Sequence, residues 1–140
     1  MDEALLEVRD YQGIGYQPLI DFGAWRVAIL RYLDDIHPER NNSMERHTQT
    51  DEVFVLVQGQ GMLILGGNDA NVNEIDSQML ECGVIYNVKR NAWHTILLSR
   101  NAKVLLVENQ DTGSHNSEYC QLSSEQQNLI RELAKRAAFD

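Results

Sequence analysis

Residues 52–67 read EVFVLVQGQGMLILGG and contain two apolar runs, which are separated by Gln58, Gly59, Gln60 and Gly61. Both runs are rich in Val, Leu and Ile, which favour β-strands. Glycine favours a tight turn between them, so the segment predicts a β-hairpin. Glu52 is the only charged residue of the first run, and a buried carboxylate requires a partner.

Other short apolar runs lie on both sides of this segment and predict further strands. They are residues 25–33, 78–81, 84–88, 93–99 and 103–108. Polar stretches at 34–46 and 66–78 have the composition of loops and turns. The glycines and the proline of residues 1–24 favour an arm with turns over a long regular element. Many short strands with glycine-rich turns favour an all-β barrel or sandwich, which we predict to be a meander.

The last segment of the chain has helical periodicity instead. Ser123 or Ser124 can cap the helix, and an apolar stripe follows at helical spacing. The stripe consists of Leu129, Ile130, Leu133, Ala134 and Ala137. A length of 140 residues corresponds to one domain. We divide it into an N-terminal arm (1–24), a barrel (25–110) and a linker with the C-terminal helix (111–140).

The charge and the cysteines exclude several classes of function. A net charge of −9 argues against a nucleic-acid surface, which requires clustered Lys and Arg. No apolar run approaches the ~20 residues of a membrane span, and the N-terminus is acidic. We therefore expect a soluble, cytoplasmic protein that binds neither nucleic acid nor membrane. Cys82 and Cys120 lack a zinc or redox spacing, so we interpret both as reduced thiols.

Three separate segments carry the candidate chemistry. Side chains two residues apart in a strand share a face, so Glu45 and His47 point the same way. Glu52 lies on the face of Phe54, and an isolated charge on such a face would cost several kcal/mol. His94 begins another apolar face. One interpretation is that these residues meet in a binding pocket; the other is that His94 is a core histidine bonded to the backbone.

These residues resemble the two sequence motifs of the cupin superfamily. His47, Glu52 and Gly59 have the spacing of the second half of the first motif, and Gly83 and His94 have the spacing of the second. The chain departs from the motifs in several places. Glu45 replaces the first histidine, no glycine opens the first motif, and Lys89, Asn91 and Leu98 replace the proline, glycine and asparagine of the second. The resemblance covers roughly residues 25–110 and implies a single antiparallel β-barrel of the jelly-roll type.

The cupin resemblance also implies a metal site. In metal-binding cupins the corresponding residues hold a divalent ion, which here gives Glu45, His47, Glu52 and His94. Two imidazoles and two carboxylates suit Mn, Fe, Ni or Zn. The alternative is a metal-free pocket in which these side chains only bond one another.

A narrower resemblance links the chain to the ureidoglycolate lyase branch of the cupins. It depends on residues 44–47 (MERH), 83–86 (GVIY) and the Trp93–His94 pair. It implies a lyase that releases urea from a small substrate carrying a carboxylate, with His47, His94 and Glu52 as catalytic residues. An imidazole would act as the general base.

The positive charges and aromatic rings near these motifs are the candidates for substrate binding. Arg46, Lys89 or Arg90 could bind the carboxylate, although each is also a plausible surface charge. Tyr86 and Trp93 could line the pocket or fill the core. Two other functions stay open, namely a non-catalytic binding or sensing module and a metal-dependent oxygenase or isomerase. We also expect a homodimer, because a sheet protein has edges to protect.

Overall fold

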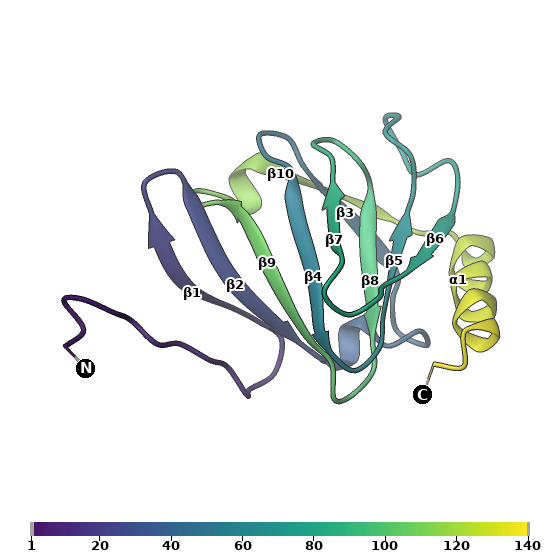
Figure 1. Ribbon diagram of the computed structural model, residues 1–140. Helices are drawn as coiled ribbons and strands as arrows, with labels where there is room; N and C mark the ends of the chain where they lie inside the picture. Colours follow the sequence, from purple (N-terminus) through teal and green to yellow (C-terminus); the bar gives the residue numbers. More distant parts are fainter. Residues whose placement is uncertain (1, 140) are drawn as a thin grey trace.

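The computed structural model describes residues 2–139, which form two facing five-stranded antiparallel sheets followed by one helix (Figure 1). The first sheet has the order β1 (Tyr16–Phe22), β2 (Trp25–Arg31), β9 (Lys103–Asn109), β4 (Glu52–Gln58), β7 (Ile85–Val88). The second has the order β10 (Ser117–Gln121), β3 (Ser43–His47), β8 (His94–Leu98), β5 (Gly61–Leu65), β6 (Asp76–Met79). Two 3-10 turns, η1 (Asp34–Ile36) and η2 (Ser114–Asn116), and the helix α1 (Ser124–Arg136) complete the elements.

The strand order confirms the predicted all-β jelly roll with a C-terminal helix. From β2 to β9 the chain alternates between the sheets, except at the hairpin of β5 and β6. This alternation corrects the predicted meander and also the predicted hairpin at residues 52–67. β4 pairs with β7 and β9, whereas β5 pairs with β6 and β8. The turn at Gly59 therefore leads from one sheet to the other.

Two strands lie in segments where the sequence predicted none. β1 occupies seven residues near the end of the predicted arm, because pairing with β2 outweighs its unfavourable composition. Pro18 is tolerated there because β1 is an edge strand and its register shifts between Pro18 and Ile20. β10 lies in the predicted linker and pairs with β3, which itself begins within the predicted loop 34–46. β6 begins two residues earlier than the predicted strand 78–81.

The apolar residues form two cores on either side of the second sheet. One core fills the space between the sheets and includes Phe54, Leu56 and Leu98. The other lies between the second sheet and α1 and includes Trp93 and Ile130. The predicted cap of α1 is confirmed, because the Ser123 side chain accepts a hydrogen bond from the backbone N–H of Gln126. No helix within residues 2–139 is both long enough and apolar enough to span a membrane.

Substitution of Gly59 by alanine is expected to destabilise the protein by at least about 1–3 kcal/mol. Gly59 has φ = +79°, and an added Cβ would lie 2.8 Å from the backbone Cα of Ala102. Gly83 is a matched control, because its φ is +82° but nothing lies within 4 Å of its added Cβ. Gly83→Ala should therefore cost only the backbone strain. Urea unfolding curves measure both, and equal losses would contradict the packing argument.

Candidate metal centre

Four side chains from both sheets converge at one point in the interior. β3 contributes Glu45 and His47, β4 contributes Glu52, and β8 contributes His94. One potential ligand atom of each lies within 4.8 Å of those of the other three. The Nε2 atoms of both histidines are 3.1 Å from Glu52 Oε1, and His47 Nε2 is 3.9 Å from Glu45 Oε1. Residues that are far apart in the sequence therefore form a compact cluster of metal-ligand groups.

The orientation of His94 implies a positive charge at this point. Its Nδ1 lies 3.0 Å from the carbonyl oxygen of Ala92, which can only accept, so Nδ1 carries a proton. In a neutral imidazole Nε2 then has a lone pair, and here it is directed at an oxygen of Glu52. Two lone pairs at 3.1 Å repel each other unless a proton or a metal ion neutralises them.

Contacts behind the cluster fix both rings. Nδ1 of His47 is 2.8 Å from the hydroxyl of Ser117 on β10, which leaves Nε2 directed at Glu52 and Glu45. Metal-binding histidines are commonly held in this way by a partner on the other ring nitrogen. The three inner side chains, His47, Glu52 and His94, are at most 7% exposed, whereas Glu45 is half-buried. The site thus has three rigid donors and one at the solvent side.

Burial and mutual contacts shift the pKa values of the cluster. Burial alone would raise the pKa of Glu52, but hydrogen bonds from His47 and His94 outweigh it and lower the pKa to about 2. Burial alone would lower the pKa of each histidine, whereas Glu52 raises both above the usual value of 6.5. The cluster therefore holds protons in the absence of another cation, as expected for a site that exchanges protons for metal.

A cavity of about 640 Å³ opens from this cluster between the two sheets. Apolar side chains such as Phe54 and Leu106 line its walls, together with polar groups from β1, β9 and β10. Glu108 on β9 accepts a hydrogen bond of 2.5 Å from the Tyr16 hydroxyl. Burial and the nearby charge of Glu52 raise the pKa of Glu108 to about 7. Arg40 also borders the cavity.

The sequence analysis did not identify Tyr16, Arg40 or Glu108 as residues of the site. The sequence pattern could have identified Glu108, because it shares one strand face with Val104 and Leu106. It is a carboxylate on an apolar face, as Glu52 is beside Phe54. Tyr16 lies in the segment that was predicted to be an arm. No local pattern distinguishes Arg40 from the other charges of its polar loop.

The predicted substrate-binding residues do not line the cavity. Arg46 points away from Glu45 and His47, and its guanidinium stacks 4.3 Å above the ring of Trp93 while bonding Glu118. Trp93 is buried in the core beneath α1. Both side chains therefore pack on the outer side of the second sheet, away from the cavity.

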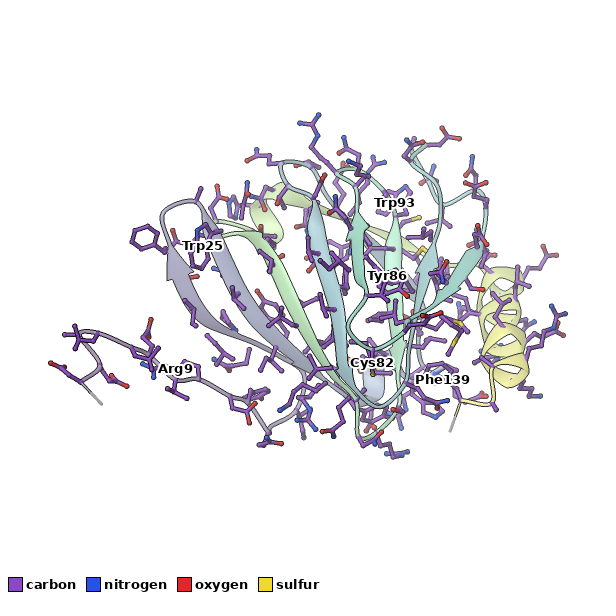
Figure 2. All side chains as sticks on the ribbon, in the orientation of Figure 1. Arg9, Trp25, Cys82, Tyr86, Trp93 and Phe139 are labelled. Carbon is purple, nitrogen blue, oxygen red and sulfur yellow. The ribbon has the colours of Figure 1, made fainter. Side chains whose placement is uncertain are left out.

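The remaining three predicted residues lie around β7. The hydroxyl of Tyr86 accepts a hydrogen bond from the backbone of Glu81, and its ring packs against the edge of the core (Figure 2). Lys89 is exposed and lies 3.8 Å from Asp51, whose other oxygen accepts from the backbone N–H of Arg90. None of the three borders the cavity.

Neither the protein-family models nor the curated proteins match this sequence. Streptomyces PAC13 in a variant solved with uridine matches with a TM-score of 0.53 and 13% identity, over 82% of this chain and 85% of that chain. CapF, a capsular polysaccharide assembling protein of Staphylococcus aureus, matches with a TM-score of 0.57 and 16% identity. The match covers 87% of this chain and 34% of CapF.

A third solved structure, the iron(II) form of HppE, matches with a TM-score of 0.51 and 14% identity, over 67% of this chain and 48% of that chain. The chain thus spans about a third of CapF and half of HppE. Identities this low show the fold alone. Together with the jelly-roll strand order, they show that the chain shares its β-barrel fold with these proteins.

Proposed function

We propose that this protein is a metal-dependent enzyme that acts on a small carboxylate-bearing substrate, with lyase chemistry of the ureidoglycolate type. The observation that supports the proposal best is the convergence of Glu45, His47, Glu52 and His94 in the lining of the cavity. A set of donors beside a cavity suits a catalytic ion, which needs an open position for its ligand.

The residues present fit a divalent ion. Two imidazole nitrogens and two carboxylates are a borderline-hard donor set, which suits Mn, Fe, Ni or Zn. The lone pairs of His94 and Glu52 that face each other are the geometry expected around a cation. When bound, such an ion would supply Lewis-acid chemistry to an oxygen of the substrate.

The charges in the cavity also suit the proposed substrate. A divalent ion would balance Glu45 and Glu52 and could attract the substrate carboxylate, whereas Asp35 and Glu108, which line the same cavity, add negative charge. Arg40 borders the cavity and can bind that carboxylate by a bidentate contact. The apolar walls, including Phe54 and Leu106, strengthen these interactions because they exclude water.

Glu108 is the proposed general base. A histidine that ligates a metal through Nε2 has no free lone pair, so the role predicted for His47 or His94 passes to Glu108. In the metal-free protein, burial and the charge of Glu52 raise the pKa of Glu108 to about 7, and its carboxylate borders the same cavity, where it could accept a proton from the substrate. It would take the proton of the substrate hydroxyl. The carbon that carries this hydroxyl then becomes the carbonyl carbon of glyoxylate as its C–N bond breaks, and the departing urea nitrogen takes up a proton.

Elemental analysis and a urea-release assay on the purified full chain test this proposal. We expect one equivalent of a transition metal per chain and release of urea from ureidoglycolate. Urea release should be lost in Glu108→Gln, while the metal content stays unchanged. Bound metal without urea release would exclude the lyase and favour a binding module. A protein that binds no added Mn²⁺, Fe²⁺, Ni²⁺ or Zn²⁺ would overturn the metal-dependent function.

Metal affinity is expected to fall at least about tenfold between pH 8 and pH 6. The pKa values of His47 and His94 are raised above 6.5, so protons compete with the metal for Nε2 more strongly at pH 6 than at pH 8. Binding must release these protons, and affinity therefore decreases as the pH falls. Calorimetric titration with Mn²⁺ at both pH values measures the change. Equal affinities would show that the two imidazoles are not the ligands.

A further inference from the structure

A row of charged residues crosses the first sheet next to the candidate metal centre. The strands β1, β2, β9 and β4 follow one another in this sheet (Figure 1). Arg26 on β2 pairs with Glu108 on β9. The register of β9 and β4, extended by one residue, sets Glu108 opposite Glu52. Side chains in such positions have Cβ atoms about 4.5–5.5 Å apart, so Glu108 is close enough to Glu52 to bind the same ion.

Glu108 is nevertheless not one of the grouped donors. The ligand atoms of Glu45, His47, Glu52 and His94 lie within 4.8 Å of one another, and Glu108 does not belong to this group. A carboxylate is a good ligand for a divalent ion. If nothing else bound Glu108, its carboxylate would therefore turn toward an ion held by Glu52. A contact on the other side of Glu108 is needed to keep it out of the coordination set.

The Tyr16 hydroxyl makes this contact. It donates a hydrogen bond of 2.5 Å to Oε1 of Glu108, a length typical of a hydroxyl bonded to an ionised carboxylate. Burial and the carboxylate of Glu108 raise the pKa of Tyr16, so the hydroxyl keeps the proton that it donates. Tyr16 belongs to β1 and Glu52 to β4, on opposite sides of β9. The hydrogen bond therefore holds Glu108 toward β1 and away from the four donors.

Arg26 fixes the direction of this hydrogen bond. A guanidinium can only donate, and Nη1 of Arg26 lies 3.4 Å from the Tyr16 oxygen and 3.2 Å from the carbonyl oxygen of Thr112. Nε of Arg26 donates to Asp21 at 3.3 Å. Because the Tyr16 oxygen accepts from Arg26, its own proton is left for Glu108. These contacts form a chain of hydrogen bonds from the edge strand to the cavity.

We propose that Tyr16 is a positioning residue that holds Glu108 outside the coordination set of the metal. One position on the ion then stays open for the substrate, and Glu108 stays free to act as the base. The inference rests on the proposed metal-dependent function, because a catalytic ion requires such an open position. The edge strand β1 supplies none of the four donors, yet it would determine whether the centre can accept a substrate.

Calorimetric titration of the full chain with Mn²⁺ tests the inference in the variant Tyr16→Phe. Loss of the hydroxyl frees Glu108 to bind the ion, so the affinity should rise at least about tenfold, the smaller of the effects usual for residues behind metal ligands. The visible absorption of bound Co²⁺ should also change, since a further ligand joins the ion. A residue that only stabilised the fold would not raise the affinity. Tyr16 lies on an edge strand and is 41% exposed, so the fold should persist, which circular dichroism verifies.

Two further variants identify the origin of the change. In the double variant Tyr16→Phe, Glu108→Gln the affinity should return to that of the wild type, because the neutral amide is a weaker ligand than the carboxylate. Tyr32→Phe is the matched control. It removes a hydroxyl that lies 3.2 Å from a carboxylate oxygen of Asp34, outside the lining of the cavity, and should leave the affinity unchanged.

The possible failures of this inference and of the proposed function are distinguishable. Unchanged or weaker Mn²⁺ binding by folded Tyr16→Phe would overturn the inference and leave the metal-dependent function in place. A rise in affinity that persists in the double variant would overturn it as well, because Glu108 would not be the added ligand. Neither measurement uses a substrate, so a wild type that binds metal without releasing urea would contradict only the lyase chemistry. A wild type that binds neither Mn²⁺ nor Co²⁺ would overturn both proposals.

Discussion

The His94→Ala variant is expected to bind Mn²⁺ or Zn²⁺ at least about 100-fold more weakly than the wild-type protein, because even residues behind a ligand change affinity by about 10–100-fold. The substitution removes a donor whose ring is fixed by the carbonyl of Ala92 and whose Nε2 is 3.1 Å from Glu52. It also leaves a space that water can fill, and water is a weaker metal ligand than an imidazole nitrogen. Calorimetric titration of the full chain measures the affinity.

His115→Ala is the matched control for this substitution. His115 is exposed and lies in η2, outside the cluster, so its removal should leave metal affinity unchanged. A loss of affinity in both variants would indicate a surface site that collects metal through any histidine. Unchanged affinity in His94→Ala would show that the contacts of Glu52 with the two imidazoles are only a hydrogen-bonded polar cluster.

Strand periodicity, a local property, placed the polar side chains on their faces, and the cupin resemblance then joined them into a set of metal-ligand candidates. Glu45 and His47 are two residues apart, and Glu52 interrupts an apolar face, so each was visible without the structure. The same rule places Arg46 on the opposite face from its neighbours. The predicted role of Arg46 in substrate binding was therefore in conflict with the rule that identified His47.

The pairing of strands could not be predicted in this way. The run from Glu52 to Leu65 has the pattern of a hairpin, and nothing local indicates that its two halves join different sheets. The partners of β4 lie more than 25 residues further along the chain, since β7 begins at Ile85 and β9 at Lys103. The cavity depends on these long-range pairings, which is why Tyr16 and Glu108 became visible only in the structure.

The Trp93→Ala variant is expected to lose about 3–5 kcal/mol of unfolding free energy, the usual cost of removing a buried tryptophan side chain. Trp93 is 2% exposed, and its indole N–H donates to the carbonyl of Asp69. Its ring also carries the guanidinium of Arg46, a contact worth up to about 2 kcal/mol when it is desolvated. Chemical denaturation of the wild type and the variant measures the loss.

Trp93→Phe separates packing from any direct role in the site. It keeps most of the apolar contact and loses the hydrogen bond to Asp69, so we expect a smaller loss of about 1–2 kcal/mol. The variant should bind metal with wild-type affinity, because residue 93 faces α1 whereas residue 94 faces the cavity. Weaker metal binding in folded Trp93→Phe would contradict this assignment. In it, Trp93 belongs to the core beneath α1, and its neighbour His94 belongs to the candidate metal centre.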